Sequence, residues 1–235
     1  MQAPLFTSFE EKVSPVHTAV IVVDVQNDFC ADAGWMGQGV RNLDLKDIQT
    51  MVPRLEQCID TARAHDVPVV WIRCAYDDTY IANNQKERMQ RRKYGRAPCL
   101  SDTWGQEFYV LKPQEGEVIV TKHRYDAFEG TNLDVILKSN GIHTLLMTGC
   151  TTECCVESTS RHGFFLGYYI VLVEDCCGTY DRALQEGTKR IIDEYFGGVS
   201  NAQEVQAAWE TLADKRTAVP QALSLNDLKS GVTAS

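Results

Sequence analysis

The sequence lacks several features that would place it in particular classes of protein. No apolar run approaches the roughly 20 residues that a helix needs to cross a bilayer, so we expect no membrane association. Lys and Arg number 23 against 32 Asp and Glu, for a net charge of −9. This balance argues against a nucleic-acid binder, because phosphate binding needs a basic surface. The first residues lack the basic start and apolar core of a secretory signal, so a cytoplasmic location is expected.

Cysteine, in contrast, is abundant, and the nine cysteines need an explanation. In a reducing compartment an odd number of cysteines is expected to remain as free thiols. Two adjacent pairs, Cys154–Cys155 and Cys176–Cys177, could meet in space and bind a metal. Zinc ligands, however, usually stand two to four residues apart, whereas adjacent residues on a helix point about 100° apart. Packing in the core therefore explains most of these thiols better than a metal site does.

Strands and helices alternate along the chain. Continuous apolar strands separated by amphipathic helices predict an α/β fold with three αβα layers, in which a doubly wound open parallel sheet of about six strands is covered on both faces. We expect one domain over 1–235, with a polar insertion or lid at 77–116 and a weakly ordered tail at 214–235. The predicted strands are His17–Asp24, Val67–Cys74, Glu117–Thr121, Thr144–Thr148, Tyr168–Glu174 and Gly198–Ser200. The predicted helices are Asp47–His65, Thr131–Ser139, Thr152–Phe165, Asp181–Tyr195 and Ala202–Leu212.

Chemically complementary residues follow three of the predicted strands. Asp24 follows the first, Lys122 the third, and the cysteines of "TGCTTECCVEST" (148–159) the fourth. In open α/β sheets ligands bind outside the carboxyl ends of the strands, so these groups are expected at one edge.

One cysteine of this cluster is placed to act as a nucleophile. Cys155 falls in the first turn of the helix expected from Thr152, where the helix N-terminus and a nearby Lys122 would stabilise a thiolate. Asp24 could take the thiol proton and pass it to a leaving group. Cys154 would be rotated toward the sheet and is interpreted as packing.

The sequence resembles the isochorismatase-like cysteine hydrolase family. Three segments match in the family's order, from about residue 17 to 209: "VVDVQNDF" (22–29), "VIVTKHRYDAF" (118–128) and "GCTTECCVESTSRHGFF" (149–165). The resemblance implies a catalytic triad of Cys155 as nucleophile, Asp24 and Lys122. It also implies a cis peptide at Cys150–Thr151, with the amides of Thr151 and Cys155 forming the oxyanion hole.

Departures from the family's patterns narrow the activity. Isochorismatases proper lack the nucleophilic cysteine, and nicotinamidases add a histidine-containing metal site that "WIRCAYDDTYIANNQ" (71–85) does not contain. No metal and no cofactor are therefore expected. Similarity to ureidoacrylate amidohydrolases and biuret hydrolases implies a small ureide or carbamoyl amide as substrate, cleaved through a thioester-like intermediate to release ammonia or a carbamate. The alternatives are a nicotinamidase-like or N-carbamoyl amino acid amidase, or a non-catalytic or redox member of the fold.

Substrate contacts are expected from four residues. By resemblance Tyr125 lines the pocket, with Phe29 and Tyr76 as further aromatic candidates. Arg124, or an arginine of the basic segment "KERMQRRKYGR" (86–96), could clamp a substrate carboxylate, although this segment could equally be solvated or face a subunit. The expected partners are a small-molecule substrate and other copies of the chain, as a homodimer or homotetramer.

Overall fold

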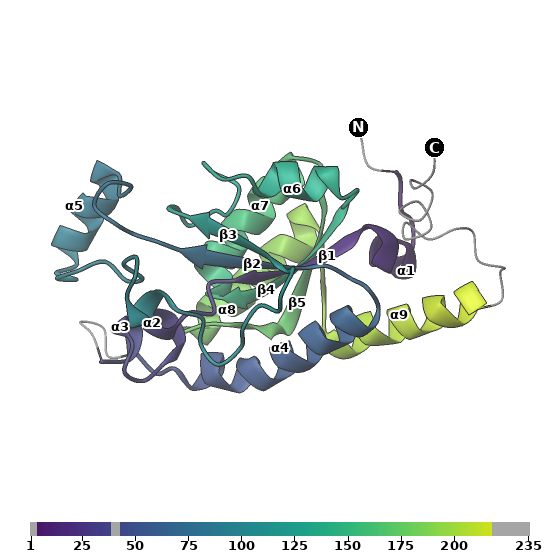
Figure 1. Ribbon diagram of the computed structural model, residues 1–235, viewed down its shortest axis with the longest axis horizontal. Coiled ribbons are helices and arrows are strands. Elements are labelled where there is room, and N and C mark those ends of the chain that lie inside the picture. Colours follow the sequence, from purple (N-terminus) through teal and green to yellow (C-terminus); the bar gives the residue numbers. More distant parts are fainter. Residues whose placement is uncertain (1–3, 39–42, 218–235) are drawn as a thin grey trace, which may run out of the picture.

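A six-stranded, all-parallel sheet organises the protein (Figure 1). The structure is a computed structural model that describes residues 4–38 and 43–217, the last four by their backbone only. In spatial order the strands are β3 (Val118–Lys122), β2 (Val69–Cys74), β1 (Thr18–Val23), β4 (Thr144–Cys150), β5 (Tyr169–Gly178) and β6 (Gly198–Ser200). The strand order reverses direction between β1 and β4, which is where open sheets commonly bind ligands.

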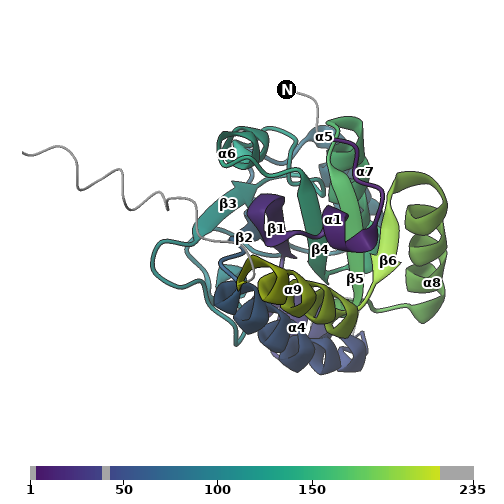
Figure 2. The same ribbon diagram turned by 90° about the vertical axis from the view of Figure 1, so that its right-hand side faces the viewer.

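Helices cover both faces of the sheet, as the three-layer αβα prediction requires (Figure 2). One face carries the long helices α4 (Lys46–Ala64) and α9 (Ala202–Thr217), and the other carries α6 (Leu133–Ser139), α7 (Glu157–Phe165) and α8 (Arg182–Ile191). Short helices α1 (Phe9–Lys12), α2 (Asn27–Cys30), α3 (Trp35–Gln38) and α5 (Asn83–Arg91) lie in the connections. Single turns of 3₁₀-helix span Pro15–His17 and Trp104–Gln106, and π-helical turns span Thr152–Val156 and Ile192–Phe196.

The burial of β1 shows why the sequence forms a covered sheet. All six of its residues are buried. Val20 and Val22 pack in the core on the α4 face, whereas Ile21 and Val23 pack in the core on the α6 and α7 face. Side chains alternate between the two faces of a strand, so a strand that is apolar at every position needs a helical layer on each side.

Most predicted elements are confirmed, and the differences lie at their ends. β3 ends on Lys122 instead of before it. β5 continues to Gly178 and includes Cys176 and Cys177. After a register shift between Met147 and Gly149 of β4, the pairing of β4 with β5 continues, with Gly149 opposite Cys177. The predicted tail at 214–235 begins inside α9, and its remainder, 218–235, lies outside the described residues.

The apolar stripe of α9 packs on its own chain. Val205 and Ala208 are buried, and the fully buried Trp209 donates a hydrogen bond from Nε1 to the carbonyl of Val13 at 2.6 Å. This stripe therefore does not need a second subunit for its burial. Among the described residues, no helix is both long and apolar enough to cross a membrane.

Candidate active site

A buried ion pair lies at the carboxyl end of the sheet. Asp24 directly follows β1 and Lys122 ends β3, and neither side chain reaches solvent. Lys122 Nζ lies 2.8 Å from Asp24 Oδ2 and donates hydrogen bonds to the carbonyl oxygens of Arg124 (2.9 Å) and Tyr125 (3.1 Å). The ammonium group thus has three acceptors, which compensates for its removal from water.

The electrostatics of this pair favour a charged lysine beside a carboxyl group that can carry a proton. Burial acts to lower the pKa of Lys122, but the negative charge and hydrogen bond of Asp24 together with the neighbouring Cys155 and Cys74 outweigh burial, and the pKa is raised. For Asp24, burial raises the pKa above its ordinary value, and Lys122 and the Cys155 thiol only partly oppose the rise. A carboxyl group with a raised pKa is suited to exchanging protons near neutral pH.

Cys155 is held at the end of β4 by a tight local turn. The Cys150–Thr151 peptide is cis, as the resemblance predicts. The helix that follows opens with the π-helical turn Thr152–Val156, in which the amides of Cys154 and Val156 both donate to the carbonyl of Thr151, at 3.1 and 3.2 Å. Thr151 and Cys155 line the same cavity as Asp24. The oxyanion hole formed by their amides stays a prediction.

The expected stabilised thiolate is not found in the resting site. The pKa of the Cys155 thiol is raised well above its usual range, first by the hydrogen bond that it shares with Cys154 and then by burial, although Lys122 opposes these effects. The negative charge of Asp24 also raises this pKa, and it acts against the helix N-terminus and the lysine from which a stabilised thiolate was expected. The arrangement is therefore a neutral thiol beside a carboxylate that can accept its proton.

Cys154 differs from its predicted role. It packs against the core cluster on the α6 and α7 face, as predicted, but it also lines the cavity and so is not rotated away from it. The hydrogen bond with Cys155 lowers the pKa of Cys154. The hydrogen bond between the two thiols therefore has opposite effects on them, because it raises the pKa of Cys155 and lowers that of Cys154.

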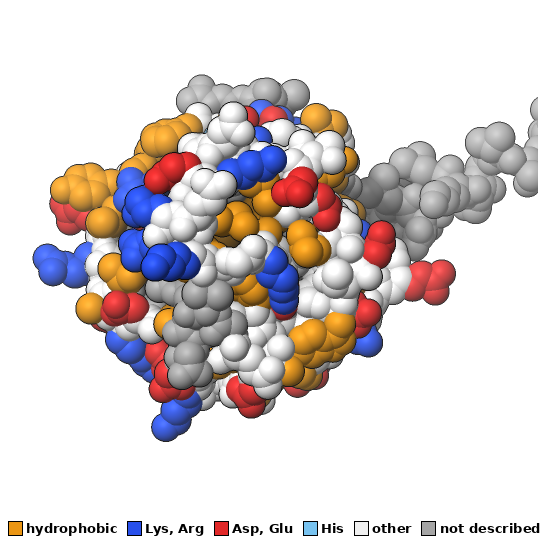
Figure 3. Space-filling view, turned by 90° about the vertical axis from the view of Figure 1, so that its left-hand side faces the viewer, with side chains coloured by type: hydrophobic (Ala, Val, Ile, Leu, Met, Phe, Trp, Pro, Cys, Tyr) orange, Lys and Arg blue, Asp and Glu red, His pale blue; other side chains and the backbone are white. Residues whose placement is uncertain are grey.

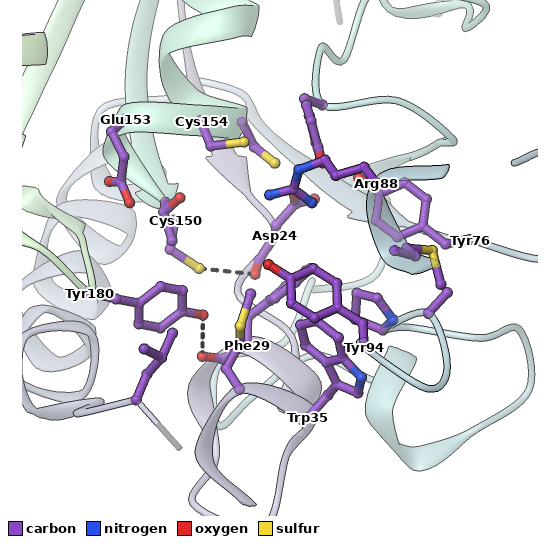
Figure 4. A pocket seen from close by; sticks show the side chains of 18 of the residues that line it. Asp24, Phe29, Trp35, Tyr76, Arg88, Tyr94, Cys150, Glu153, Cys154 and Tyr180 are labelled. Atoms are coloured by element: carbon purple, nitrogen blue, oxygen red, sulfur yellow. Dashed lines mark hydrogen bonds between the residues drawn. The ribbon is translucent and has the colours of Figure 1, made fainter. Parts of the chain in front are cut away.

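The cavity above these groups measures about 380 Å³, and three of the four predicted substrate-binding residues line it. Phe29, Tyr76 and Tyr125 all contribute to its wall (Figure 4 shows Phe29 and Tyr76). Arg124 does not. Its guanidinium donates to the carbonyl oxygens of Tyr80 and His123, both at 2.7 Å, so local backbone groups hold it outside the cavity.

Part of the basic segment 86–96 lines the cavity. Helix α5 places Arg88 in the cavity wall, with its guanidinium over the rings of Tyr94 (5.6 Å) and Tyr125 (6.0 Å). No carboxylate of the described residues forms an ion pair with Arg88. Figure 3 shows hydrophobic side chains exposed between Lys and Arg on this face of the molecule. Arg88 is thus placed to contact a bound molecule, while the lid and subunit-facing interpretations of the segment both stay predictions.

A second buried carboxylate, that of Asp28 on α2, fastens the end of the segment 86–96 to the short helices α2 and α3. Asp28, 1% exposed, accepts two hydrogen bonds from the guanidinium of Arg96 (2.9 and 3.1 Å). It also accepts the backbone amides of Cys99 (2.7 Å) and Trp35 (3.0 Å). The Asp28 side chain thus joins α2, α3 and the end of the segment 86–96, and thereby fixes the wall of the cavity.

Sequence reasoning missed part of the cavity wall. Trp35, Tyr94, Tyr180 and Glu153 also line it (Figure 4). Tyr180 donates its hydroxyl proton to the carbonyl of Phe29 at 2.8 Å. Glu153 precedes the predicted nucleophile by two positions, which is the signal that could have identified it.

The remaining chemistry-bearing groups lie elsewhere. His123 stacks on Tyr80, with ring centroids 3.8 Å apart, and its Nδ1 contacts the carbonyl of Ala75 at 2.7 Å. Within 4–38 and 43–217, no group of three or more His, Cys, Asp or Glu side chains is placed to hold a metal ion. All nine cysteines are free thiols.

Comparisons with known proteins identify the family of this chain. The isochorismatase domain family matches residues 18–204. The ureidoacrylate amidohydrolase RutB of Methylorubrum extorquens is 32% identical over 205 residues, covering 81% of this chain and 82% of the relative. The protein of the same name from Klebsiella pneumoniae is 31% identical over 204 residues, covering 81% and 86%.

Solved structures show the same fold. A cysteine hydrolase from Pseudomonas syringae superposes with a TM-score of 0.75 at 25% identity, covering 90% of this chain and 99% of the other. N-carbamoylsarcosine amidase from Thermoplasma acidophilum superposes with a TM-score of 0.64 at 25% identity, covering 79% and 96%.

Proposed function

This chain belongs to the isochorismatase family and is a hydrolase of amide carbon–nitrogen bonds, and we propose that it cleaves a ureido acid with Cys155 as the nucleophile. The observation that carries the proposal is the Asp24–Lys122 ion pair beside the Cys155 thiol, in a cavity that the guanidinium of Arg88 also lines without an ion pair to any carboxylate of the described residues. The names of the relatives, ureidoacrylate amidohydrolase and N-carbamoylsarcosine amidase, support a carbamoyl substrate.

The first half of the reaction transfers the carbamoyl group to the enzyme. Cys155 Sγ attacks the ureide carbonyl while its proton passes to Asp24, and Lys122 remains protonated. The amides of Thr151 and Cys155 donate to the oxyanion of the tetrahedral intermediate. Asp24 then returns the proton to the departing nitrogen, ammonia leaves, and a carbamoyl thioester remains on Cys155.

The second half restores the thiol. Water gives a proton to Asp24 and attacks the carbonyl of the thioester, and the same proton then returns to the departing sulfur. The product is a carbamate. Two nitrogens donate electrons into a ureide carbonyl, which makes it less electrophilic than that of a simple amide. Oxyanion stabilisation is therefore decisive, since one lost donor typically costs about 3–4 kcal/mol.

Two thiol variants test the assignment of the nucleophile. Cys155→Ala and Cys155→Ser should abolish ammonia release, because each removes the thiol that forms the proposed covalent intermediate. Cys154→Ala should retain most of the activity, because it removes only a hydrogen-bond partner of the nucleophile. An active Cys155→Ala combined with an inactive Cys154→Ala would show that the roles are reversed.

A substrate screen and a matched pair of arginine variants test the substrate class. Ammonia release is measured with ureidoacrylate, ureidopropionate, biuret, triuret, N-carbamoyl amino acids, nicotinamide and aliphatic amides. Arg88→Gln should raise KM for the ureido acids and leave neutral biuret unaffected. Arg92→Gln, at an exposed position of the same segment, is the control. Turnover confined to nicotinamide or aliphatic amides contradicts the ureide assignment.

The proposed partners are the small-molecule substrate and further copies of the chain, without nucleic acid. A homodimer or homotetramer is supported by large apolar side chains exposed near the end of α7 and after α8, with Phe165 71% and Tyr195 67% exposed. Sedimentation at micromolar concentration tests this assembly, and a clean monomer contradicts it.

A further inference from the structure

The cavity offers more space than a short, unbranched ureido acid needs. Its volume of about 380 Å³ lies within the range of roughly 300–1,000 Å³ that holds drug-sized ligands. At ~30 Å³ per water molecule in the liquid, that space corresponds to about a dozen waters. A three-carbon ureido acid would leave part of this volume to water against the cavity wall.

The wall of this extra space is apolar and fixed. Phe29 and Trp35 are each 6% exposed and come from α2 and α3. The Trp35 ring packs edge-to-face on Tyr94, with centroids 5.0 Å apart, and the Tyr180 hydroxyl holds the backbone of Phe29. In Figure 4 these rings lie together on the side of the cavity opposite Cys154. Leu184 of α8 continues the apolar wall toward the solvent.

The charged groups that line the cavity are engaged by other groups of the protein, which leaves the apolar wall available. Glu153 accepts a hydrogen bond from Thr179 Oγ1 at 2.9 Å, and Asp181 accepts the backbone amides of Ala183 and Leu184. Arg88 is held by the faces of Tyr94 and Tyr125, and Asp24 and Lys122 are paired below the thiol. A ureido acid bound by its carboxylate at Arg88 and by its carbamoyl group at Cys155 is fixed at both ends. The carbon between those ends then carries any further substituent into the remaining space, which the aromatic rings line.

We propose that the substrate is an N-carbamoyl amino acid with a large apolar side chain of aromatic or leucine size. This inference rests on the proposed function and specifies its substrate class. Water released from the aromatic wall provides the selectivity. Full burial of a Leu or Phe side chain lowers the free energy of substrate binding. The gain favours a substrate with that side chain by roughly 10-fold or more over a substrate that lacks it.

The test is a comparison of kcat/KM across one homologous series. Ammonia release from N-carbamoylphenylalanine and N-carbamoylleucine should exceed that from N-carbamoylglycine by roughly 10-fold or more in kcat/KM. Equal or higher kcat/KM for N-carbamoylglycine or ureidoacrylate overturns the inference and leaves the proposed function intact. Hydrolysis of other amides but of no ureide overturns the proposed function, and the inference fails with it.

A pair of tryptophan variants tests where the side chain binds. Leu184, 54% exposed, lines the rim of the cavity, so Leu184→Trp narrows the apolar part from the solvent side with little risk to folding. It should lower kcat/KM for N-carbamoylphenylalanine at least several-fold more than for N-carbamoylglycine. Val135→Trp, at a position of α6 that is 66% exposed and outside the cavity, should change neither value. A uniform effect of Leu184→Trp on both substrates contradicts the assigned binding region.

Discussion

Asp28→Asn is expected to destabilise the protein more than any exposed charge substitution. Asn has the same shape, but it removes the negative charge that faces Arg96 and offers an N–H where the carboxylate accepted one. Removing one partner of a buried pair typically costs about 3–5 kcal/mol. Arg96 is 50% exposed and can return to water, so we expect a loss at the lower end, about 3 kcal/mol. For a chain of this length that corresponds to a fall in Tm of roughly 6–12 °C.

The pH dependence gives this prediction a distinct signature. Burial acts to raise the pKa of Asp28, but hydrogen bonds from Arg96 and from the Cys99 and Trp35 amides outweigh it, and the pKa lies below the ordinary value of 3.8. A carboxyl group whose pKa is lower in the folded state stabilises the protein above its unfolded pKa. That contribution is lost as the pH falls through the folded pKa. The difference between the wild type and Asp28→Asn should therefore be constant near neutral pH and shrink below pH 3.8.

Urea denaturation followed by circular dichroism measures the effect. Glu87→Gln, which removes an exposed pair with Arg91, is the control and should cost less than about 0.5 kcal/mol. A loss below about 1 kcal/mol for Asp28→Asn, or a difference that grows as the pH falls, would refute the reasoning. Because Asp28 also fixes the cavity wall, kcat/KM should fall in the same variant under conditions in which it is fully folded.

Two further predictions follow from the geometry. Gly149→Ala should unfold the end of β4 or prevent expression, because Gly149 has φ +99 and an added Cβ would lie 2.1 Å from the carbonyl oxygen of Val23. Thermal denaturation measures the loss of stability, and a change in Tm of less than about 2 °C contradicts the prediction. Activity should survive exhaustive dialysis against EDTA, because the stretch after β2 supplies no histidine and the described residues form no metal-binding cluster. A loss of ammonia release that zinc or manganese restores contradicts this prediction.

The place of Asp24 and Lys122 at the carboxyl edge of the sheet could be predicted from the sequence, because it follows from the order and direction of the strands. Parallel strands deliver their carboxyl ends to one edge, so Asp24 and Lys122 could be brought together from strand patterns alone. The motif around Cys155 and its cis peptide depended on family resemblance, since no local pattern predicts a cis bond between non-proline residues.

The remainder of the site depends on tertiary packing that sequence patterns do not encode. From the sequence, Arg88 and Arg124 are equally good candidates for a substrate contact. Only the position of α5 in the folded chain places Arg88, and not Arg124, in the wall of the cavity. Trp35 was not predicted because its place follows from the hydrogen bond to Asp28. The pKa of Cys155 was misjudged because the hydrogen bond with Cys154 and the burial that raise it are properties of the folded chain.

The strand order has a consequence for the way the protein acquires its activity. Asp24, Lys122 and Cys155 come from three strands that are distant along the chain, and β2 separates two of those strands in the sheet. Helices α4 and α9 can form from local contacts, but the ion pair beside the thiol requires the crossovers on both sides of β1 to be complete. Non-local pairings of this kind form slowly, because loop closure precedes the contacts that stabilise it. During refolding, helical signal should therefore return before ammonia-releasing activity, and the catalytic centre serves as a reporter of the last long-range contacts to form.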